Sequence, residues 1–551
     1  MPNVFRFALE VDSDRDGTLE TGEFGRWDWK WSAEGPGAIA LPDLGQRGGE
    51  LELTPMRLTI DDLPVDGAVV LGINGLAARF ATVYLRSGAT LQPIAGRVGE
   101  RVVLLSDALG ASVDLMIQPR QFPGLGFDGL IEITAIGVLR VNGKLQQTGA
   151  ADRAVMRVAP WILTPNTCEP QRVYAVVVPD AAGGANEQFR QELAVACTEA
   201  GVPLQLIDTT QLPAGESYDR WIQDEIEFGY AEAPGRVVDV VVDGPRNRGL
   251  DEIGMSAQLG TGLGKVLLDA DFNVRSSLDS FGNLEVSPPC AVGPAVFPLG
   301  RIVFGTKQPS DDNGRKAALR LRQFLYEQRV QTPFELDTDW LYVGHVDEII
   351  SFVPGIDEDS FRVLLASPAL ALELLQGWQR SGNGGAVLWR GQRQSDEGLP
   401  GSAEETIDQL LAKQAIVSFN RQCEEKLNGV AADLARYLGV LPAEIVRIPV
   451  LFESEGGQAV AYFPDMVNHL VLGGMSIVPR PYGPLIGGVD GFEQAFRQAL
   501  PDRQVRFIDD WLSYHKQLGE VHCGTNVLRR PLPGVRWWEH RYEGVWDASV
   551  R

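Results

Sequence analysis

One short motif recurs along this chain, and its repetition constrains the fold more than any other feature of the sequence. The segment GEVHC at 519–523 resembles GHVDE at 344–348, and each follows an acidic residue and a Trp-Leu pair, at 510–512 and 339–341. A third segment of the same kind is DRWIQDE at 219–225. Repeated use of one supersecondary unit predicts a ring of similar units, which brings an acid, a His-x-Asp and a Cys to one centre.

Helical and β-forming patterns alternate in the second part of the chain. Amphipathic runs predict helices over 187–200, 312–328 and 492–500, followed by strands over 203–208, 332–336 and 504–509. Residues 4–157 instead contain short alternating apolar runs punctuated by Gly, Pro and Asp, which predict strands. We therefore expect an α+β protein of two domains, a β-sandwich over 1–160 and a repeated α/β assembly over 161–551.

Composition excludes several classes of function. The net charge of −24 argues against a nucleic-acid partner and favours cations or basic peptides. No glycine-rich phosphate loop is present, no apolar run approaches the roughly 20 residues of a membrane span, and residues 1–6 lack the pattern of a signal peptide. Five widely spaced cysteines without Cys-x-x-Cys indicate reduced thiols. We expect a cytoplasmic protein with no membrane partner.

Cys523 stands apart from the other cysteines. A free cysteine is most often a small buried apolar residue, and we interpret four of the five in that way: Cys168, Cys197, Cys290 and Cys423. Cys523 lies between His522 and Gly524 in a polar, turn-forming segment, where a thiol can meet a ligand. From its own neighbours alone, Cys523 is equally compatible with a nucleophile and with a buried residue.

The matching GHVDE segment supplies a histidine and an acid. If 344–350 is a strand, His345 and Asp347 lie on the same face. A lone histidine is more often a structural hydrogen-bonding residue. The acid two residues away and the matching Cys segment favour a Cys/His/acid site.

Acidic residues alternate with others after Trp221. An extended backbone would place Gln223, Glu225 and Glu227 on one face and Asp224 on the other. Three oxygen-bearing side chains on one strand face, two of them negatively charged, are unfavourable unless a cation binds them. Ca²⁺ is such a cation, because it prefers oxygen ligands. Asp224 would then face the reactive centre. The alternative is an acidic strand exposed to solvent.

A twelve-residue segment near the N-terminus has the spacing of a calcium-binding loop. Glycine stands at its sixth position, and its oxygen-bearing residues are Asp12, Asp14, Asp16, Thr18, Glu20 and Glu23. The preceding residues 4–9 predict a strand, so we expect a calcium loop outside a helix-loop-helix. The alternative is an acidic surface turn.

These motifs resemble those of the peptidyl-arginine deiminases. The matching segments, in order, are 158–167, 220–230, 245–250, 280–289, 343–348 and 519–527, with weaker similarity at 27–29 and 37–39. The resemblance implies an immunoglobulin-like β-sandwich followed by a five-bladed α/β propeller, the pentein fold. It also implies calcium-dependent conversion of peptidyl-arginine to peptidyl-citrulline by a short form that lacks the N-terminal domain of the animal enzymes.

The resemblance also implies a role for each site residue. Cys523 corresponds to the nucleophile and His345 to the general acid/base, while Asp224 and Asp347 correspond to the guanidinium-binding carboxylates. Trp221 would line the substrate channel, and Arg248 would hold the substrate backbone. One calcium ion would be bound by Gln223, Glu227, Glu285 and the carbonyl oxygens of Phe281 and Leu284, and a second by Glu225, Asp243, Gly244 and Asn247.

Some positions depart from the family pattern. Gly244 stands where animal members have a serine, which requires the calcium ligand there to be a carbonyl oxygen. Residues 43–47 align with an acidic calcium loop but have lost most of its acids, and Gln517 replaces an arginine near the substrate in some members.

The planar guanidinium group of arginine can bind two carboxylates at once, because it offers five hydrogen-bond donors and keeps its positive charge.

Two other functions stay open: deimination of free arginine or another small guanidine, and an inactive module that binds basic peptides in the presence of calcium.

Overall fold

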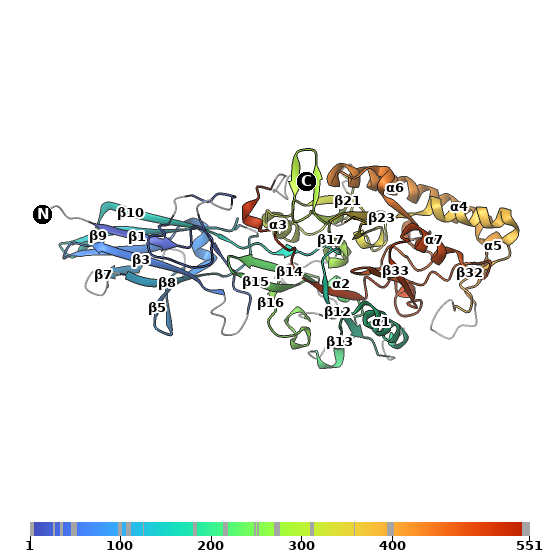
Figure 1. Ribbon diagram of the computed structural model, residues 1–551, viewed down its shortest axis with the longest axis horizontal. Coiled ribbons are helices and arrows are strands. Elements are labelled where there is room, and N and C mark those ends of the chain that lie inside the picture. The colour runs from blue at the N-terminus through green and yellow to red at the C-terminus, as the bar shows by residue number, and fades with distance from the viewer. Residues whose placement is uncertain are drawn as a thin grey trace.

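Strands from the first part of the chain form one end of an elongated molecule, and the α/β part forms the other (Figure 1). The computed structural model describes residues 5–25, 28–32, 37–45, 52–96, 102–105, 112–124, 126–179, 185–212, 219–246, 250, 253–268, 276–308, 313–357, 359–393 and 402–542.

Two five-stranded sheets make up the first part. One has the order β1 (Arg6–Val11), β3 (Thr54–Asp62), β8 (Ser112–Pro119), β5 (Ala81–Ser87), β6 (Thr90–Ala95). The other has the order β2 (Ala38–Ala40), β10 (Lys144–Val158), β9 (Leu130–Val141), β4 (Gly67–Ile73), β7 (Val102–Leu105). Alternate residues of β9, among them Ile131 and Ile133, are buried in one core with Leu9 and Ile117. This alternation is the signal that predicts strands here.

Five small sheets in the second part of the described chain share one connectivity. In each, a central strand is antiparallel to one neighbour and parallel to the other. Their orders are β11 (Ile162–Leu163), β14 (Ile226–Ala233), β15 (Arg236–Asp243), β16 (Gly264–Leu267); β34 (Thr525–Arg529), β12 (Pro170–Val177), β13 (Leu204–Asp208); β17 (Leu284–Val286), β20 (Ile302–Thr306), β21 (Phe334–Asp337); β22 (Ile350–Pro354), β23 (Phe361–Ser367), β26 (Val446–Pro449); and β29 (Leu470–Leu472), β30 (Met475–Pro479), β33 (Gln504–Ile508). The repeated motif of the sequence therefore corresponds to a repeated sheet.

Three helices lead into the last strand of a sheet, as the sequence predicts. They are α1 (Glu187–Ala200), α3 (Leu319–Glu327) and α7 (Gly491–Ala499). The helix predicted over 312–328 is too long, because residues 313–318 are not helical. Arg315 in that stretch donates instead to the carbonyl oxygens of Asp339, Leu341 and Tyr342.

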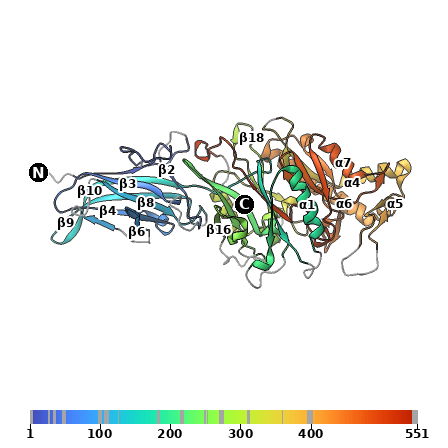
Figure 2. The ribbon, with the colours of Figure 1, turned by 60° about the horizontal axis from the view of Figure 1, so that its bottom comes forward.

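The described residues of the second part also form three further helices and four hairpins. Helices α4 (Pro368–Trp378), α5 (Ile407–Ala412) and α6 (Gln414–Leu438) lie at the far end (Figure 2). Four hairpins pair β18 (Cys290–Val292) with β19 (Ala295–Phe297), β24 (Val387–Leu388) with β25 (Glu405–Thr406), β27 (Phe452–Glu455) with β28 (Gln458–Ala461), and β31 (Leu485–Ile486) with β32 (Val489–Asp490). Among the described residues, no helix has the length and apolar character needed to cross a membrane.

An aromatic cluster joins a loop of the first part to residues near the C-terminus. Trp537 is fully buried, stacks on Trp29 with ring centroids 6.0 Å apart, and meets Trp31 edge-on at 5.7 Å. Its indole nitrogen donates to the carbonyl oxygen of Glu232 at 2.8 Å. Trp537 therefore connects three distant segments of the chain.

Replacing Trp537 with alanine should lower the free energy of unfolding by about 3–5 kcal/mol, because the change leaves a large cavity at this junction. Urea denaturation followed by circular dichroism measures the loss. Ile356→Ala is the control, since that side chain is 78% exposed and its truncation should change stability little. Equal midpoints for W537A and the parent protein would contradict the assignment.

Candidate active site

Residues that come shortly before one strand of each repeated sheet meet in one place. Asp224 lies two residues before β14, Gly282 two before β17, Asn468 two before β29 and Cys523 two before β34. Residues 345–347 come shortly before β22. The repeated fold therefore delivers one short segment from each of the five sheets to a common centre.

Residues 221–227 do not form the strand that alternation predicts. Ile222–Glu225 is a helical turn, α2, because Asp219 Oδ1 accepts from the Trp221 amide at 2.9 Å and the Asp224 amide donates to the Trp221 carbonyl oxygen at 3.0 Å. The prediction of a shared strand face was therefore wrong. Gln223 lies in the helical turn and Glu227 in strand β14, and Gln223 Nε2 donates to Glu227 Oε2 at 2.7 Å.

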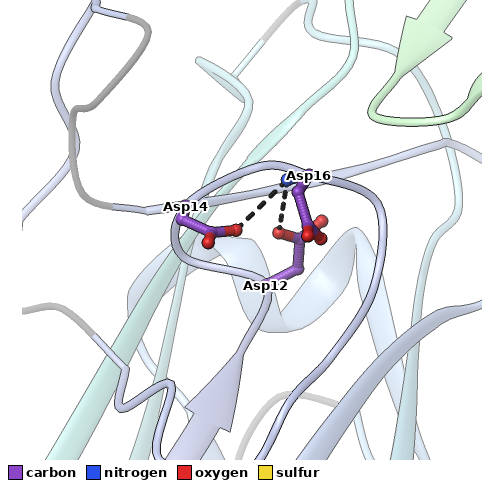
Figure 3. Close-up of side chains that lie close together, drawn as sticks. All are labelled: Asp12, Asp14 and Asp16. Carbon is purple, nitrogen blue, oxygen red and sulfur yellow. Dashed lines mark hydrogen bonds between the residues drawn. The ribbon is translucent and has the colours of Figure 1, made fainter.

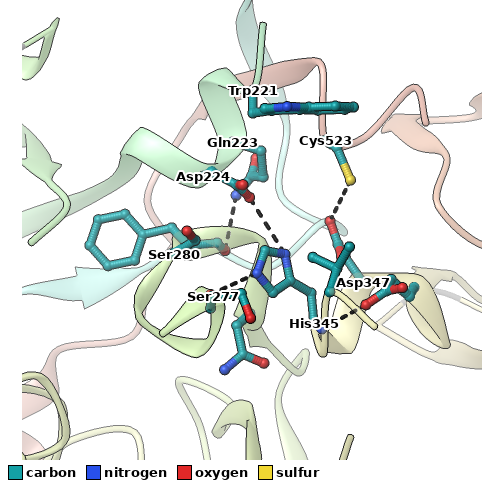
Figure 4. A network of polar contacts seen from close by, with 12 residues as sticks. Trp221, Gln223, Asp224, Ser277, Ser280, His345, Asp347 and Cys523 are labelled. Carbon is teal, nitrogen blue, oxygen red and sulfur yellow. Dashed lines mark hydrogen bonds and ion pairs between the residues drawn. The ribbon is translucent and has the colours of Figure 1, made fainter. Parts of the chain in front are cut away.

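Residues 344–348 are likewise a turn and not a strand. The Glu348 carboxylate accepts from the amides of Gly344 and His345 at 2.8 and 2.7 Å, and this closes a 3₁₀ turn over Val346–Glu348. The prediction that His345 and Asp347 alternate along a strand was wrong. Both side chains are nevertheless buried beside Asp224 and Cys523 (Figure 4).

Cys523 is 7% exposed and contacts two polar side chains. Its sulfur donates to Asp347 Oδ2 at 3.4 Å and accepts from Asn468 Nδ2 at 3.2 Å. Asn468 Oδ1 also accepts from the Cys523 amide at 3.2 Å, so one asparagine side chain hydrogen-bonds both the backbone and the sulfur of Cys523. No repeated motif marks Asn468, and our sequence interpretation missed it.

His345 lies between two acceptors. Its Nε2 is 2.8 Å from the Ser277 carbonyl oxygen, and its Nδ1 is 3.5 Å from Asp224 Oδ1. Because a carbonyl oxygen can only accept, we assign a hydrogen to Nε2. Nδ1 is then the ring atom that can take up or release a proton. A Cβ on Gly282 would lie 2.5 Å from Nδ1, so glycine there permits this approach.

A cleft of about 470 Å³ opens onto these groups. It is lined by Asp224, His345 and Cys523, and the Trp221 ring lies over Cys523 (Figure 4). Asp347 Oδ1 is buried and makes no hydrogen bond to the described residues. Such a site can bind a planar cationic group beside a thiol, because the cation would supply the donor that this carboxylate oxygen lacks.

Electrostatics keep this thiol protonated when no cation is bound. Burial raises the pKa of Cys523 well above its usual value, and the negative charges of Asp347 and Asp224 raise it further. A cationic ligand in the cleft would oppose these two charges and favour the thiolate.

A second, smaller cavity of about 30 Å³ lies behind the cleft and has room for one ion or water molecule. Gln223, Glu227, Glu285 and His522 line it. Burial raises the pKa of Glu227 to about 8, and the nearby charge of Glu285 contributes to this shift. Burial likewise raises the pKa of Glu285 to about 7. A buried carboxylate, Glu285, and a partly buried one, Glu227, lie beside an amide side chain, and such a set suits a hard cation such as Ca²⁺.

His522 lies between this cavity and the active-site carboxylates. Its Nδ1 is 3.0 Å from Asp347 Oδ2, and its Nε2 is 3.5 Å from Glu285 Oε1. Burial lowers the pKa of His522, but the hydrogen bond to Asp347 and the charge of Glu285 outweigh burial and raise it. The sequence alone indicates His522 only as a neighbour of Cys523. Its position within the repeated motif is the sequence feature that could have marked it as a site residue.

The second predicted calcium set is only partly described. Glu225 and Asp243 are buried, and the Gly244 amide donates to the Glu225 carbonyl oxygen at 2.6 Å. Asp243 Oδ2 accepts from the Gly254 amide at 2.7 Å. Asn247, and with it Arg248, which was predicted to bind substrate, lie outside the described residues.

The acidic loop near the N-terminus gathers three of its six predicted ligands. Carboxylate oxygens of Asp12, Asp14 and Asp16 lie within 4.8 Å of one another (Figure 3). Thr18 donates to Asp16 and Glu20 at 2.6 and 2.8 Å, whereas Glu23 Oε2 accepts from the Glu20 amide at 2.9 Å. A strand, β1, precedes the loop, as the sequence predicts.

Comparisons with known proteins identify the relatives of this chain. A family model described as protein-arginine deiminase (PAD) matches residues 148–539. Protein-arginine deiminase type-1 of Mus musculus is 36% identical over 557 residues, which cover 96% of this chain and 82% of that protein. The human type-3 protein is 40% identical over 562 residues, with the same coverage. Among solved structures, C. jejuni agmatine deiminase aligns with 68% of this chain and 97% of its own at 12% identity and a TM-score of 0.38.

Replacing Asp347 with asparagine should accelerate alkylation of Cys523 by iodoacetamide at pH 8 about tenfold or more, because loss of a negative charge lowers the thiol pKa by roughly one unit. In the parent protein, the rate should still be rising above pH 9, since the pKa is raised. Peptide mass spectrometry reads each cysteine separately. Asp357→Asn, an exposed position, is the control. Equal Cys523 rates in D347N and parent would refute the electrostatic argument.

Proposed function

The chain belongs to the protein-arginine deiminase family, and on this basis we propose that it hydrolyses the guanidinium of peptidyl-arginine to peptidyl-citrulline and ammonia. The observation that carries the proposal is that Cys523, His345 and Asp224 line one cleft, with Asp347 in contact with the Cys523 sulfur. A thiol and a proton-exchanging ring beside two carboxylates are the groups that this hydrolysis needs.

Substrate binding is the first step of the proposed mechanism. Asp224 and Asp347 accept hydrogen bonds from the guanidinium nitrogens and fix its plane. Bound guanidinium also supplies the positive charge that the Cys523 site lacks, so binding favours release of the thiol proton. The substrate thereby activates its own nucleophile.

Two covalent steps follow. The Cys523 sulfur forms a bond to the central guanidinium carbon, and the proton that the thiol loses passes to His345 Nδ1. His345 Nδ1 gives this proton to the departing nitrogen as the carbon–nitrogen bond breaks and ammonia leaves, and a thiouronium cation remains. His345 then takes a proton from water, and the resulting hydroxide adds to the same carbon. The carbon–sulfur bond breaks, the sulfur regains the proton held by His345, and the added hydroxyl loses its proton to ammonia, which gives citrulline, ammonium and the free thiol.

Calcium is the proposed cofactor. Gln223, Glu227, Glu285 and the carbonyl oxygens of Phe281 and Leu284 would hold one ion; Glu225, Asp243, Gly244 and Asn247 would hold another. The two carboxylates that line the small cavity support the first set. When bound, the ion supplies positive charge for these carboxylates. We also propose a calcium site at the Asp12 loop, carried by Asp12, Asp14 and Asp16.

The finer features of the fold are proposed on the same basis. Residues 1–160 would form an immunoglobulin-like sandwich and residues 161–551 a five-bladed propeller of the pentein type. The shared connectivity of five sheets supports the propeller. Pairing of β12, near the start of the second part, with β34, the last strand among the described residues, also supports it. Five free cysteines support a reducing, cytoplasmic location.

Protein and peptide substrates are favoured over small guanidines. The chain is similar to protein-arginine deiminases over 96% of its length, including the first part. Trp221, over the cleft, would line the channel that the arginine side chain enters, and Arg248 would hold the substrate backbone. An inactive binding module is disfavoured, because the full set of reactive groups is present.

Blocked benzoyl-arginine amide should yield citrulline with calcium and not with a chelator, whereas free arginine should be a poor substrate. Cys523→Ala should lower kcat by about 10³-fold or more, because the covalent step is lost. Cys290→Ala is the matched control, since Cys290 lies in hairpin β18–β19. A colorimetric citrulline assay measures all arms. Turnover of free arginine alone would reassign the substrate, and activity in C523A would refute the nucleophile.

Calcium should raise the thermal unfolding midpoint more at pH 8 than at pH 6. Glu227 and Glu285 have raised pKa values in the folded protein, about 8 and 7, so without metal their protonated forms favour folding at low pH. This contribution is lost as pH rises through 7–8. Calcium restores it by binding the ionised carboxylates.

Differential scanning fluorimetry with calcium or EGTA tests this expectation. The double variant Glu227→Gln, Glu285→Gln should lose the extra calcium effect at pH 8 and retain any effect of the other sites. An equal calcium shift at both pH values in the parent would contradict it.

A further inference from the structure

Two pairs of consecutive residues form the wall between the cleft and the small cavity. Asp224 and Cys523 line the cleft, whereas their neighbours Gln223 and His522 line the cavity. The Gln223 amide donates to the Cys523 carbonyl oxygen at 3.3 Å, which joins the two pairs through the backbone. Cation binding on one side and guanidinium binding on the other are therefore separated by a single layer of residues.

His522 is the side chain that spans this wall. Its Nδ1 contacts Asp347 Oδ2 at 3.0 Å and its Nε2 lies 3.5 Å from Glu285 Oε1. The side chain is 12% exposed, and the backbone amide donates to the Asn468 carbonyl oxygen at 3.2 Å. Both the ring and its backbone are thus held in place.

These contacts set the orientation of the Asp347 carboxylate. Oδ2 accepts from both His522 and Cys523, while Oδ1 makes no hydrogen bond to the described residues. Holding one oxygen fixes the carboxylate plane and leaves the other oxygen for a ligand. His522 does not line the cleft; on that side of the wall its ring contacts Asp347, which in turn contacts the Cys523 sulfur.

We propose that His522 is a positioning residue that couples cation binding at Glu285 to guanidinium binding at Asp347. This inference rests on the proposed function. A cation bound to Glu285 fixes that carboxylate, the fixed carboxylate orients the ring, and the ring orients Asp347. Because coupling is reciprocal, guanidinium binding must tighten cation binding by the same factor.

Two substitutions separate the two contacts of the ring. His522→Asn places an amide nitrogen near the position of Nδ1, so it keeps the Asp347 contact and loses Glu285. His522→Gln reaches the position of Nε2, so it keeps the Glu285 contact and loses Asp347. Coupling through the ring requires both contacts and should be lost in both variants.

The experiment uses full-length protein carrying Cys523→Ala, which binds arginine without turnover. Calorimetry measures the Kd of benzoyl-arginine amide in EGTA and in saturating calcium. We expect calcium to tighten binding about tenfold or more in the C523A parent, the usual range of coupling between two sites, and less than about twofold in both His522 variants. His540→Asn, a histidine near the C-terminus and outside both cavities, is the matched control and should keep the parental factor.

The outcomes distinguish this inference from the function on which it rests. A C523A parent that binds no arginine amide with calcium would overturn the proposed function and the inference together. A parent that binds it equally with and without calcium, or parental coupling in H522N or H522Q, would overturn the inference alone. A reciprocal titration needs no change at position 522: arginine amide must tighten calcium binding in the parent by the same factor, and an unchanged calcium Kd would also overturn it.

Discussion

Buried negative charge around one thiol is the constraint on which the rest of this site depends. Asp224, Asp347 and Glu285 are each less than 9% exposed, and ionised carboxylates at such depth are costly unless cations or hydrogen-bond donors compensate them. In the proposed mechanism, a guanidinium in the cleft and a metal ion in the small cavity supply the compensating positive charge. Selectivity for a cationic substrate and the proposed dependence on a cationic cofactor would then have one physical origin.

Repetition of the sheet explains how distant residues reach this centre. In each of the five sheets, one strand begins shortly after a segment that reaches the common centre, so residues 224, 282, 345, 468 and 523 converge although almost 300 positions separate the first from the last. Short turns hold these segments, as Asp219 and Glu348 illustrate with their hydrogen bonds to backbone amides. The strands form the scaffold of the site, and the turns orient the side chains towards its centre.

The same two turns show where prediction from the sequence stops. The repeated motif was sufficient to predict that Cys523, His345 and acids converge, and alternating or amphipathic runs predicted most strands and helices. Alternation of polar residues at 221–227 and 344–350 suggested strands, because the local pattern does not reveal that a nearby carboxylate will bind the backbone and form a turn. Asn468 and the bridging role of His522 depend on contacts between different sheets, which no local pattern encodes.

Pairing of β12 with β34 has a consequence for biosynthesis. The sheet around β12 gains its neighbour β34 only when Thr525–Arg529 has been made, and Cys523 directly precedes that strand. During translation, therefore, β34 and Cys523 leave the ribosome only after every other described strand of the five sheets has been made. If Cys523 is the nucleophile, as proposed, the growing chain gains its reactive group in the same step that completes its sheets.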